Sequence, residues 1–301
     1  MTTKADSNTV IPILALCRFS GVQPRLLEVL IRHYGSIDRI LQADAGSLMG
    51  IGGMTTEIAN RVADAKSHLS RADDYYSQLR QRDISIVSRF DDAYPDRLFE
   101  LNDPPAVLYF RGTLPDTAGK LVALTGGEKA SNEGIELTVE AARRFAEAGV
   151  KVIASLSRGV DAAAHLGSKS GNGNSYAVLN SGLDNVYPED SRPLAIDIVK
   201  EGGLLSEYPP ESKYQPDNFK SSNRIIAALA QAVVVTECYR ESTVTLDLLK
   251  CCGQIGKLAF VMIDPRHGAL ADTDSLNAAV THGAIPMVGL DKTDDIVQSL
   301  V

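Results

Sequence analysis

Four segments of the sequence combine glycine, serine, threonine or asparagine with a charged side chain directly before a predicted helix. These residue types suit an anionic ligand, because glycine lets the backbone approach a phosphate and a helix start offers free backbone N–H groups. The hydroxyl and amide side chains can also cap the helix that follows. The candidates for binding a phosphate-bearing ligand are Gly126, Gly127, Lys129, Ser131, Ser157, Arg158, Gly159, Asn223, Arg224, Glu237, Ser242 and Thr243.

The first of these segments, residues 125–134, differs from the common nucleotide-binding loops. It has neither the Gly-x-Gly-x-x-Gly pattern of dinucleotide-binding proteins nor the Gly-Lys-Ser/Thr of a Walker A loop. A flexible turn in which Ser131 caps the next helix is the alternative to a phosphate site here. In the third segment, residues 219–226, capping by Asn223 and a surface ion pair of Arg224 are the corresponding alternative. In the fourth segment, residues 236–245, Glu237 at the expected end of a strand can accept from a ribose, a base edge or a backbone amide.

Asp161 and His165 lie in the second segment, residues 155–165, and are four positions apart. On a helix this spacing places both side chains on one face, where they can hydrogen-bond to each other. We expect a structural histidine held by Asp161, and a ligand or catalytic contact by His165 is the alternative.

The sequence contains no recognisable catalytic set or metal site. It has no nucleophile with a neighbouring base and no close pair of carboxylates with an evident role. The five histidines are scattered, and the four cysteines, Cys17, Cys238, Cys251 and Cys252, form no Cys-x-x-Cys pair, which favours free and mostly buried thiols. These features predict a binding protein rather than an enzyme, with no metal and no cofactor.

The elements that must position the four segments follow Asp83, where short apolar runs begin to alternate with longer helical patterns. This alternation predicts an α/β fold with a Rossmann-like, doubly wound and mostly parallel sheet and helices on both faces. Ligands bind such folds at the carboxyl ends of the strands, so Arg158, Arg224 and several helix starts should converge on one edge of the sheet. The expected strands are 107–110, 121–125, 151–154, 175–179, 204–206, 232–236 and 258–262. The expected helices are 133–148, 160–169, 193–201, 223–231 and 243–255.

Residues 1–80 contain helical patterns without strand alternation. They predict a small all-helical domain of the helix-hairpin-helix or SAM-like kind, followed by the Rossmann-like domain in residues 81–301. The pair Gly50-x-Gly52 between two short helices resembles the turn of a helix-hairpin-helix, in which glycines let the backbone approach a DNA phosphate. A simple tight turn between packed helices is the alternative. Residues 66–82 are polar with helical spacing and predict a connecting helix.

Charge limits the ways in which the chain could bind nucleic acid. The 301 residues have a net charge of −8, with 9 basic and 8 acidic side chains in residues 1–80 and 21 and 30 in residues 81–301. Broad electrostatic attraction to nucleic acid normally requires a basic surface, so a DNA site here must be a local pocket of modest affinity. No apolar run reaches the roughly 20 residues of a membrane span, and the start lacks the features of a signal peptide. The sequence therefore predicts a cytoplasmic protein without a membrane partner.

Five ordered motifs between residues 94 and 290 resemble the DprA/Smf family of DNA-processing proteins. They lie at residues 94–112 (with Asp-Pro-Pro-Ala-Val-Leu-Tyr-Phe-Arg-Gly), 157–165 (Ser-Arg-Gly-Val-Asp-Ala-Ala-Ala-His), 177–188, 203–209 and 223–227. The helical N-terminal segment also fits the usual prefix of this family. The resemblance implies a non-catalytic protein that binds single-stranded DNA, forms a homodimer and hands DNA to the RecA recombinase in natural transformation. It also implies that the pocket at the strand ends accepts DNA phosphates and bases.

The sequence departs from the family pattern at this pocket. Glu128 follows Thr-Gly-Gly where the family usually has Val-Gly-x-Arg, Ser222 replaces the first Arg of an Arg-Asn-Arg, and Ser242-Thr243 replaces Ser-Gly. Two positive charges are lost and one negative charge is gained, which weakens the expected attraction for a phosphate. We also expect no C-terminal winged-helix-like extension after Val301, although many family members have one.

Two other functions are alternatives to DNA processing. A diverged DprA-like protein could act as the antitoxin-like regulator of a cognate toxin-like protein in a phage-defence or toxin–antitoxin module. Nucleotide-sensing domains and nucleotide-cleaving enzymes belong to the wider Rossmann group, so the pocket could instead hold a free nucleotide. A toxin-like enzyme encoded nearby would favour the first alternative, and a nucleotide bound to the purified protein would favour the second.

Overall fold

The computed structural model describes residues 7–116, 118–239, 242–266, 268–269 and 273–300. The chain divides into two compact units. The helical unit comprises Met1–Tyr94 and Asn102–Tyr109, and the sheet unit comprises Pro95–Leu101 and Phe110–Val301. The domain boundary that the sequence suggests between residues 80 and 81 stays a prediction.

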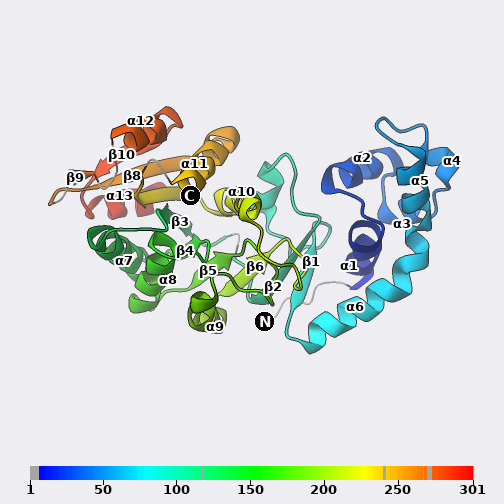
Figure 1. The fold of residues 1–301 in the computed structure, drawn as a ribbon, viewed down its shortest axis with the longest axis horizontal. Helices are drawn as coiled ribbons and strands as arrows, with labels where there is room; N and C mark the ends of the chain where they lie inside the picture. The colour runs from blue at the N-terminus through cyan, green and yellow to red at the C-terminus, as the bar shows by residue number, and fades with distance from the viewer. Residues whose placement is uncertain (1–6, 117, 240–241, 267, 270–272, 301) are drawn as a thin grey trace. The chain divides into compact units, whose positions relative to one another are not determined.

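Short helices form most of the helical unit (Figure 1). Burial follows the sequence pattern, since Leu27 and Leu30 of α2 and Ile40 of α3 are fully buried. The prediction of helices without strands is confirmed for residues 7–80, and α6 supplies most of the predicted connecting helix. The elements are α1 (Ser7–Ile13), the π-helix η1 (Leu14–Phe19), α2 (Pro24–Tyr34), α3 (Ile37–Leu41), α4 (Ala45–Leu48), α5 (Thr56–Ala63), the 3₁₀ turn η2 (Asp64–His68), α6 (Leu69–Gln81) and β1 (Ser85–Ser88).

Parallel strands form the sheet unit in the order β6-β5-β4-β3-β7-β8-β10. The order reverses at β3: Val122 of β3 lies opposite Val152 of β4 on one side and Ala232 of β7 on the other. The last residues of β2 extend the sheet beyond β6, and the short β9 pairs antiparallel with β8. The strands are β2 (Val107–Gly112), β3 (Leu121–Gly126), β4 (Lys151–Ala154), β5 (Ser175–Val178), β6 (Gly203–Ser206), β7 (Ala232–Glu237), β8 (Leu258–Asp264), β9 (Gly268–Ala269) and β10 (Ile285–Val288).

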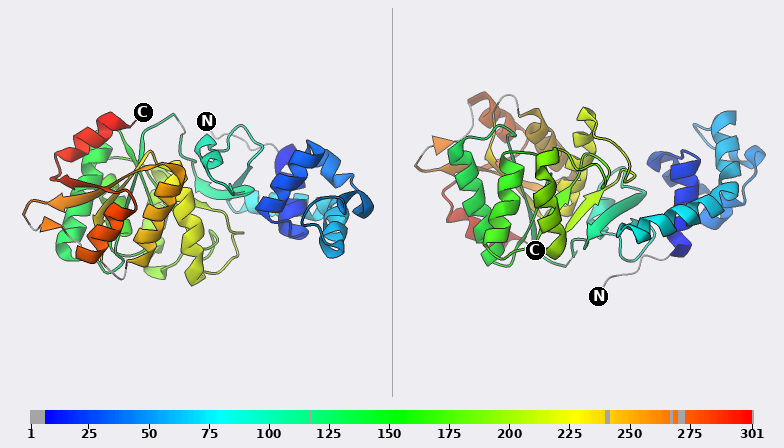
Figure 2. Two further views of the ribbon diagram at one scale, coloured as in Figure 1. Left: turned by 90° about the horizontal axis from the view of Figure 1, so that it is seen from above. Right: turned by 60° about the horizontal axis from the view of Figure 1, so that its bottom comes forward.

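Helices cover both faces of this sheet, which confirms the predicted doubly wound α/β class. Figures 1 and 2 show α7, α8 and α9 on one face and α10, α11 and α12 on the other. Within the described residues, no helix is both long and apolar enough to cross a membrane. The helices are α7 (Asn132–Glu147), α8 (Val160–Ser170), α9 (Arg192–Glu201), α10 (Phe219–Leu229), α11 (Thr243–Ile255), α12 (Thr273–Thr281) and α13 (Lys292–Ser299), with 3₁₀ turns η3 (Asp96–Glu100), η4 (Glu189–Ser191) and η5 (Pro216–Asn218).

The central strands are buried on both faces, which explains why they are continuous apolar runs in the sequence. Val122, Leu124, Val152 and Val234 are fully buried, together with Phe145 of α7. A rigid core of this kind fixes where each strand ends and therefore where the loops of the carboxyl edge begin.

The predicted strands and helices of the sheet unit are all present, but α10 begins at Phe219 rather than Asn223. The preceding turn η5, which starts at Pro216, already has the backbone geometry of a helix start. The elements β9, β10, α12 and α13 are not predicted from the sequence. β10 is the end strand of the sheet, and its run Ile-Pro-Met-Val has no alternation of apolar and polar residues and contains Pro286, which argues against a strand.

The expectation that Asp161 holds His165 is wrong, because both side chains bond to Ser155 just after β4. His165 Nε2 donates to the Ser155 carbonyl oxygen at 2.9 Å, and the Ser155 hydroxyl donates to the Asp161 carboxylate. Within the described residues, Asp161 Oδ1 and His165 Nδ1 are buried without a hydrogen-bond partner. Burial therefore raises the pKa of Asp161 to about 7 and lowers the pKa of His165 to about 4.

These two pKa shifts act on stability in opposite directions, and single variants should separate them. The unfolded chain loses the Asp161 proton near pH 3.8 and the folded protein near 7, so this group lowers stability as the pH rises between these values. His165 binds its proton near pH 6.5 when unfolded and near 4 when folded, so it raises stability as the pH rises. Between about pH 4.5 and 6.5, the free energy of unfolding of His165→Gln should fall by about 2 kcal/mol, because only the Asp161 contribution remains. Over the same range the free energy of unfolding of Asp161→Asn should rise by about 2 kcal/mol, because only the His165 contribution remains. Urea unfolding at several pH values measures both.

The unaltered protein should change less with pH than either variant, because its two contributions offset each other. The same pH dependence in all three proteins would contradict burial of these two groups as the source of the shifts.

Candidate functional site

Three loops meet beside β3, where the strand order reverses. They follow β3 (residues 127–131), β4 (155–159) and β7 (238–242, of which 240–241 lie outside the described residues). The Gly127 N–H group donates to the Glu237 carbonyl oxygen at 3.2 Å, and the Gly127 carbonyl oxygen accepts from the N–H group of Val160 at 3.2 Å. These bonds bring the three loops together at the carboxyl edge, the position of ligand sites in doubly wound folds.

Two candidate glycines are required by the close packing of these loops. Gly159 has a φ of 70°, and a Cβ there would overlap the carbonyl oxygens of Gly127 and Glu128. A Cβ on Gly126 would lie 2.6 Å from the Glu237 carbonyl oxygen. Both glycines therefore position the backbone of the site, and neither position accepts a larger residue without a shift of the loops.

Glu237 binds the backbone amide that was one of its three predicted partners. Its side chain is buried, and both carboxylate oxygens lie 3.0 Å from the backbone nitrogen of Ser131, which donates to them. The Ser131 hydroxyl in turn caps α7 by accepting from the Gly134 N–H group at 3.0 Å. Position 134 requires glycine, because a Cβ there would overlap the Glu237 carboxylate. Glu237 and Ser131 thus fasten the start of α7 to the end of β7.

Arg158 is the exposed cation of the loop after β4. Its side chain is 55% exposed, its Nε donates to Asp190 Oδ2 at 2.9 Å, and its Nη1 lies 3.8 Å from Glu128 Oε1. The hydrogen bond and charge of Asp190 raise the pKa of Arg158 above its ordinary value, with smaller contributions from Glu128 and Tyr187. Arg158 is therefore fully charged and held between two carboxylates of the same chain.

Arg224 forms an ion pair at the end of β6, and this pair is largely buried rather than on the surface. Its Nη2 lies 2.6 Å from Glu207 Oε2, and the two side chains are only 15% and 12% exposed. The Ser221 hydroxyl donates to the other carboxylate oxygen of Glu207. Separating a buried pair leaves a charge without solvent, so Arg224 is held more firmly than Arg158.

Asn223 and Ser222 lie beside Arg224 and are buried. The Asn223 amide donates to the Val244 carbonyl oxygen at 2.8 Å and to Asp247 Oδ2 at 3.0 Å, which fastens α10 to α11. The Ser222 hydroxyl donates to the side-chain oxygen of Asn180 in the loop after β5. Both side chains therefore position the start of α10.

The remaining candidates divide into exposed and turn-forming residues. Lys129 and Thr243 are exposed. The Ser242 hydroxyl accepts from the Tyr239 N–H group at 3.1 Å, and the Ser157 hydroxyl lies 2.9 Å from the Ser155 hydroxyl. Lys129 thus adds a second exposed cation to the loops that carry Arg158.

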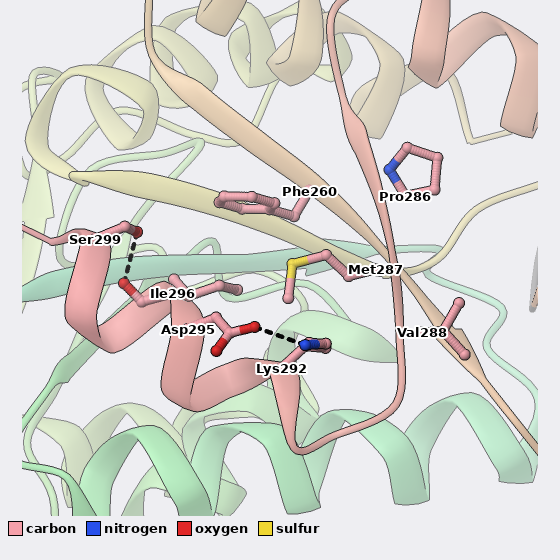
Figure 3. Close-up of a pocket in the computed structure, with 8 residues that line it drawn as sticks. All are labelled: Phe260, Pro286, Met287, Val288, Lys292, Asp295, Ile296 and Ser299. Carbon is pink, nitrogen blue, oxygen red and sulfur yellow. Dashed lines mark hydrogen bonds and ion pairs between the residues drawn. The ribbon is translucent and has the colours of Figure 1, made fainter.

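The sheet unit also has a large hollow that does not include the candidate residues of the three loops. It has a volume of about 410 Å³ and is lined by Phe260 of β8, by β10 and by α13, where Lys292 pairs with Asp295 at 2.8 Å (Figure 3). None of its lining residues belongs to the three loops. No group of three or more His, Cys, Asp or Glu side chains in the described part of the chain could hold a metal ion. The hollow is therefore separate from the predicted ligand site.

Of the three acidic partners of the two arginines, Glu128 is expected from the sequence as an opposing charge, whereas Asp190 and Glu207 are not. Glu207 directly follows β6, just as Glu237 ends β7, so an acid at a strand end was a usable signal. Asp190 lies in the turn η4, 32 positions from Arg158, and no pattern in the sequence joins the two.

Comparisons with known proteins show the family. A model of the family described as DNA recombination-mediator protein A matches residues 85–300. The protein Smf of Synechocystis sp. is 32% identical over 228 residues, which cover 74% of this chain and 57% of that protein. The DNA processing protein DprA of Streptococcus pneumoniae is 32% identical over 170 residues, which cover 56% of this chain and 60% of that protein. The matches thus span about half to three fifths of the length of these relatives.

Solved structures of such proteins share the fold. DprA of Streptococcus pneumoniae has a TM-score of 0.79 at 24% identity, over 99% of both chains. DprA of Helicobacter pylori, described for its single-stranded DNA binding mode, has a TM-score of 0.62 at 21% identity, over 72% of this chain and 97% of that one. The predicted Rossmann-like fold with an N-terminal helical region is confirmed. With its family model, its relatives and its fold in agreement, this chain belongs to the DprA/Smf family.

Proposed function

We propose that the chain binds single-stranded DNA, without catalysing a reaction, in DNA processing and recombination during natural transformation. The proposal rests mainly on one observation: the guanidinium group of Arg158 is half exposed at the place where the loops after β3 and β4 meet. Membership of the DprA/Smf family supports it, as does the Helicobacter pylori relative that is described as binding single-stranded DNA. Transfer of the DNA to RecA and a cytoplasmic location are further parts of the proposal.

A DNA phosphate has to compete with carboxylates for Arg158. Asp190 and Glu128 are both more than half exposed, so water can solvate them when a phosphate takes their place. Ion pairs between exposed groups contribute little to stability, and this exchange therefore costs little. Glu128 nevertheless stays close as a repulsive charge. The expected result is binding of modest affinity.

Replacing Arg158 and Glu128 tests whether these loops bind DNA. Arg158→Ala should weaken binding of a labelled oligo(dT) about tenfold, as expected for loss of a charge-assisted contact. Glu128→Arg should tighten binding, because it removes a repulsive charge and adds an attractive one. Fluorescence anisotropy at several salt concentrations measures both effects.

Arg143→Ala is the matched control, because Arg143 also pairs with two carboxylates but lies on the outer surface of α7. It should bind DNA like the unaltered protein. DNA binding that is unchanged in Arg158→Ala and in Glu128→Arg would remove these loops as a DNA site. The antitoxin-like or nucleotide-sensing function would then be preferred.

Single strands should bind more tightly than duplexes, with a shallow salt dependence, because few basic groups line the loops. Duplex binding as tight as single-strand binding would indicate the turn at Gly50 and Gly52 as the main contact. A Cβ at Gly52 meets no atom within 4 Å, and one at Gly50 lies 3.9 Å from the nearest atom. The double alanine variant should therefore fold normally, so a loss of duplex affinity would assign a DNA contact and unchanged affinity would assign a packing turn.

A homodimer formed through the sheet unit is the second part of the proposal. Large apolar side chains are exposed on β8, α12 and β10, namely Leu258, Val280, Ile285 and Val288. β10 is the end strand of the sheet, and a cluster of exposed apolar side chains is typical of a surface that associates with another protein. We therefore place the contact between the two copies at this edge.

Val288→Glu should convert a dimer to a monomer at micromolar concentration, because the association would bury the new charge. Size-exclusion chromatography with light scattering measures the mass. Ile196→Glu is the control, since Ile196 is also exposed but lies on α9. A purely monomeric unaltered protein would contradict the homodimer and favour a heteromeric partner.

A further inference from the structure

Two tyrosine rings stack at the carboxyl edge of the sheet unit. Tyr187, in the loop after β5, and Tyr214, in the loop after β6, have ring centroids 3.9 Å apart and ring planes inclined by 16°. Tyr187 is 49% exposed, whereas Tyr214 is half-buried. The pair therefore presents an aromatic surface to solvent and supports it from behind with a second ring.

The stack is not needed to join the two loops, because backbone contacts already do so. The Gly182 N–H group donates to the Ser212 carbonyl oxygen at 2.8 Å, and the Asp184 N–H group donates to the Pro210 carbonyl oxygen at 3.0 Å. The backbones pack so closely at Gly182 that a Cβ there would overlap Pro210. A large exposed ring beside loops that are already joined is available for a ligand.

The stack lies next to the charged cluster of the candidate site. Asp190 follows Tyr187 by three positions, and its carboxylate accepts from Arg158 Nε at 2.9 Å. Burial raises the pKa of Tyr214, and the neighbouring Tyr187 and Glu128 raise it further. The two rings thus lie near Arg158 and Glu128 on the sheet unit.

We propose that the exposed ring of Tyr187, supported by Tyr214, stacks a nucleobase of single-stranded DNA while Arg158 holds the adjoining phosphate. This inference rests on the proposed function and adds to it the pair of side chains that would contact a base. Every base has a π-face, so stacking of this kind tolerates any sequence. The platform should therefore bind oligomers of different sequence about equally.

Oligomers with and without bases test the platform directly. The probes are labelled oligo(dT) and an oligomer of equal length made of abasic nucleotides, measured by anisotropy with the full chain. Tyr187→Leu keeps an apolar side chain but removes the ring, and should weaken oligo(dT) binding about tenfold. It should leave binding of the abasic oligomer unchanged. Arg158→Ala should weaken both, because the phosphate is present in both.

Tyr187→Phe is the matched control, since it keeps the ring and should bind both oligomers like the unaltered protein. Tyr214→Leu should lower oligo(dT) affinity in the same direction as Tyr187→Leu, because it removes the support of the platform. Thermal unfolding of each variant checks that the fold is kept. A variant of Tyr187 that unfolds is replaced in the comparison by Tyr214→Leu, which tests the same stack.

The outcomes separate this inference from the proposed function. If the unaltered protein binds oligo(dT) but Tyr187→Leu and Tyr214→Leu bind it equally well, the stacking platform is wrong and DNA binding stands. If Tyr187→Leu loses affinity for both oligomers alike, the ring acts on the phosphate site and not on a base, which also overturns the inference. If the unaltered protein binds neither oligomer, the proposed function itself fails.

Discussion

The close approach of Gly159 to the backbone of the loop after β3 is the constraint on which the carboxyl edge depends. No side chain separates the start of α8 from the carbonyl oxygens of Gly127 and Glu128, and the positive φ of Gly159 allows that contact. Arg158, the residue before Gly159, therefore lies beside β3, where the strand order reverses. Glu128 is brought to the same place, so the position of the cation and the position of its opposing charge have one structural cause.

The two arginines that the sequence treats alike have different physical roles. Arg224 is paired with Glu207 at a site that is largely closed to water, and the Ser221 hydroxyl donates to the other oxygen of that carboxylate. Breaking this pair would leave a poorly solvated charge, so the pair holds α10 to the end of β6. Arg158 pairs with carboxylates that water can solvate, and it can exchange partners at low cost. Of the two, Arg158 is the one suited to a ligand.

The sequence predicts those parts of the fold in which a residue's neighbours in the chain determine its environment. Val122, Val152 and Val234 belong to apolar runs because their strands are buried on both faces, and these strands are found where expected. β10 is not found, because its run Ile-Pro-Met-Val does not alternate and contains Pro286, which argues against a strand. A backbone amide was one of the expected partners of Glu237, and an acid after β6 was a usable signal for Glu207, but no sequence pattern pairs Arg158 with Asp190.

Those partnerships depend on topology. Arg158 meets Asp190 across 32 positions, and Arg224 meets Glu207 across 17. Tyr187 meets Tyr214 only because β5 and β6 are neighbours and their loops leave the same edge.

The tyrosine pair explains how an acidic chain can prefer single strands. Stacking requires no net positive charge, and the bases of a duplex already stack on each other, so only unpaired bases can stack on the ring. A chain of net charge −8 that relied on phosphate contacts alone would bind both forms weakly, whereas an exposed ring beside one exchangeable arginine favours the single strand.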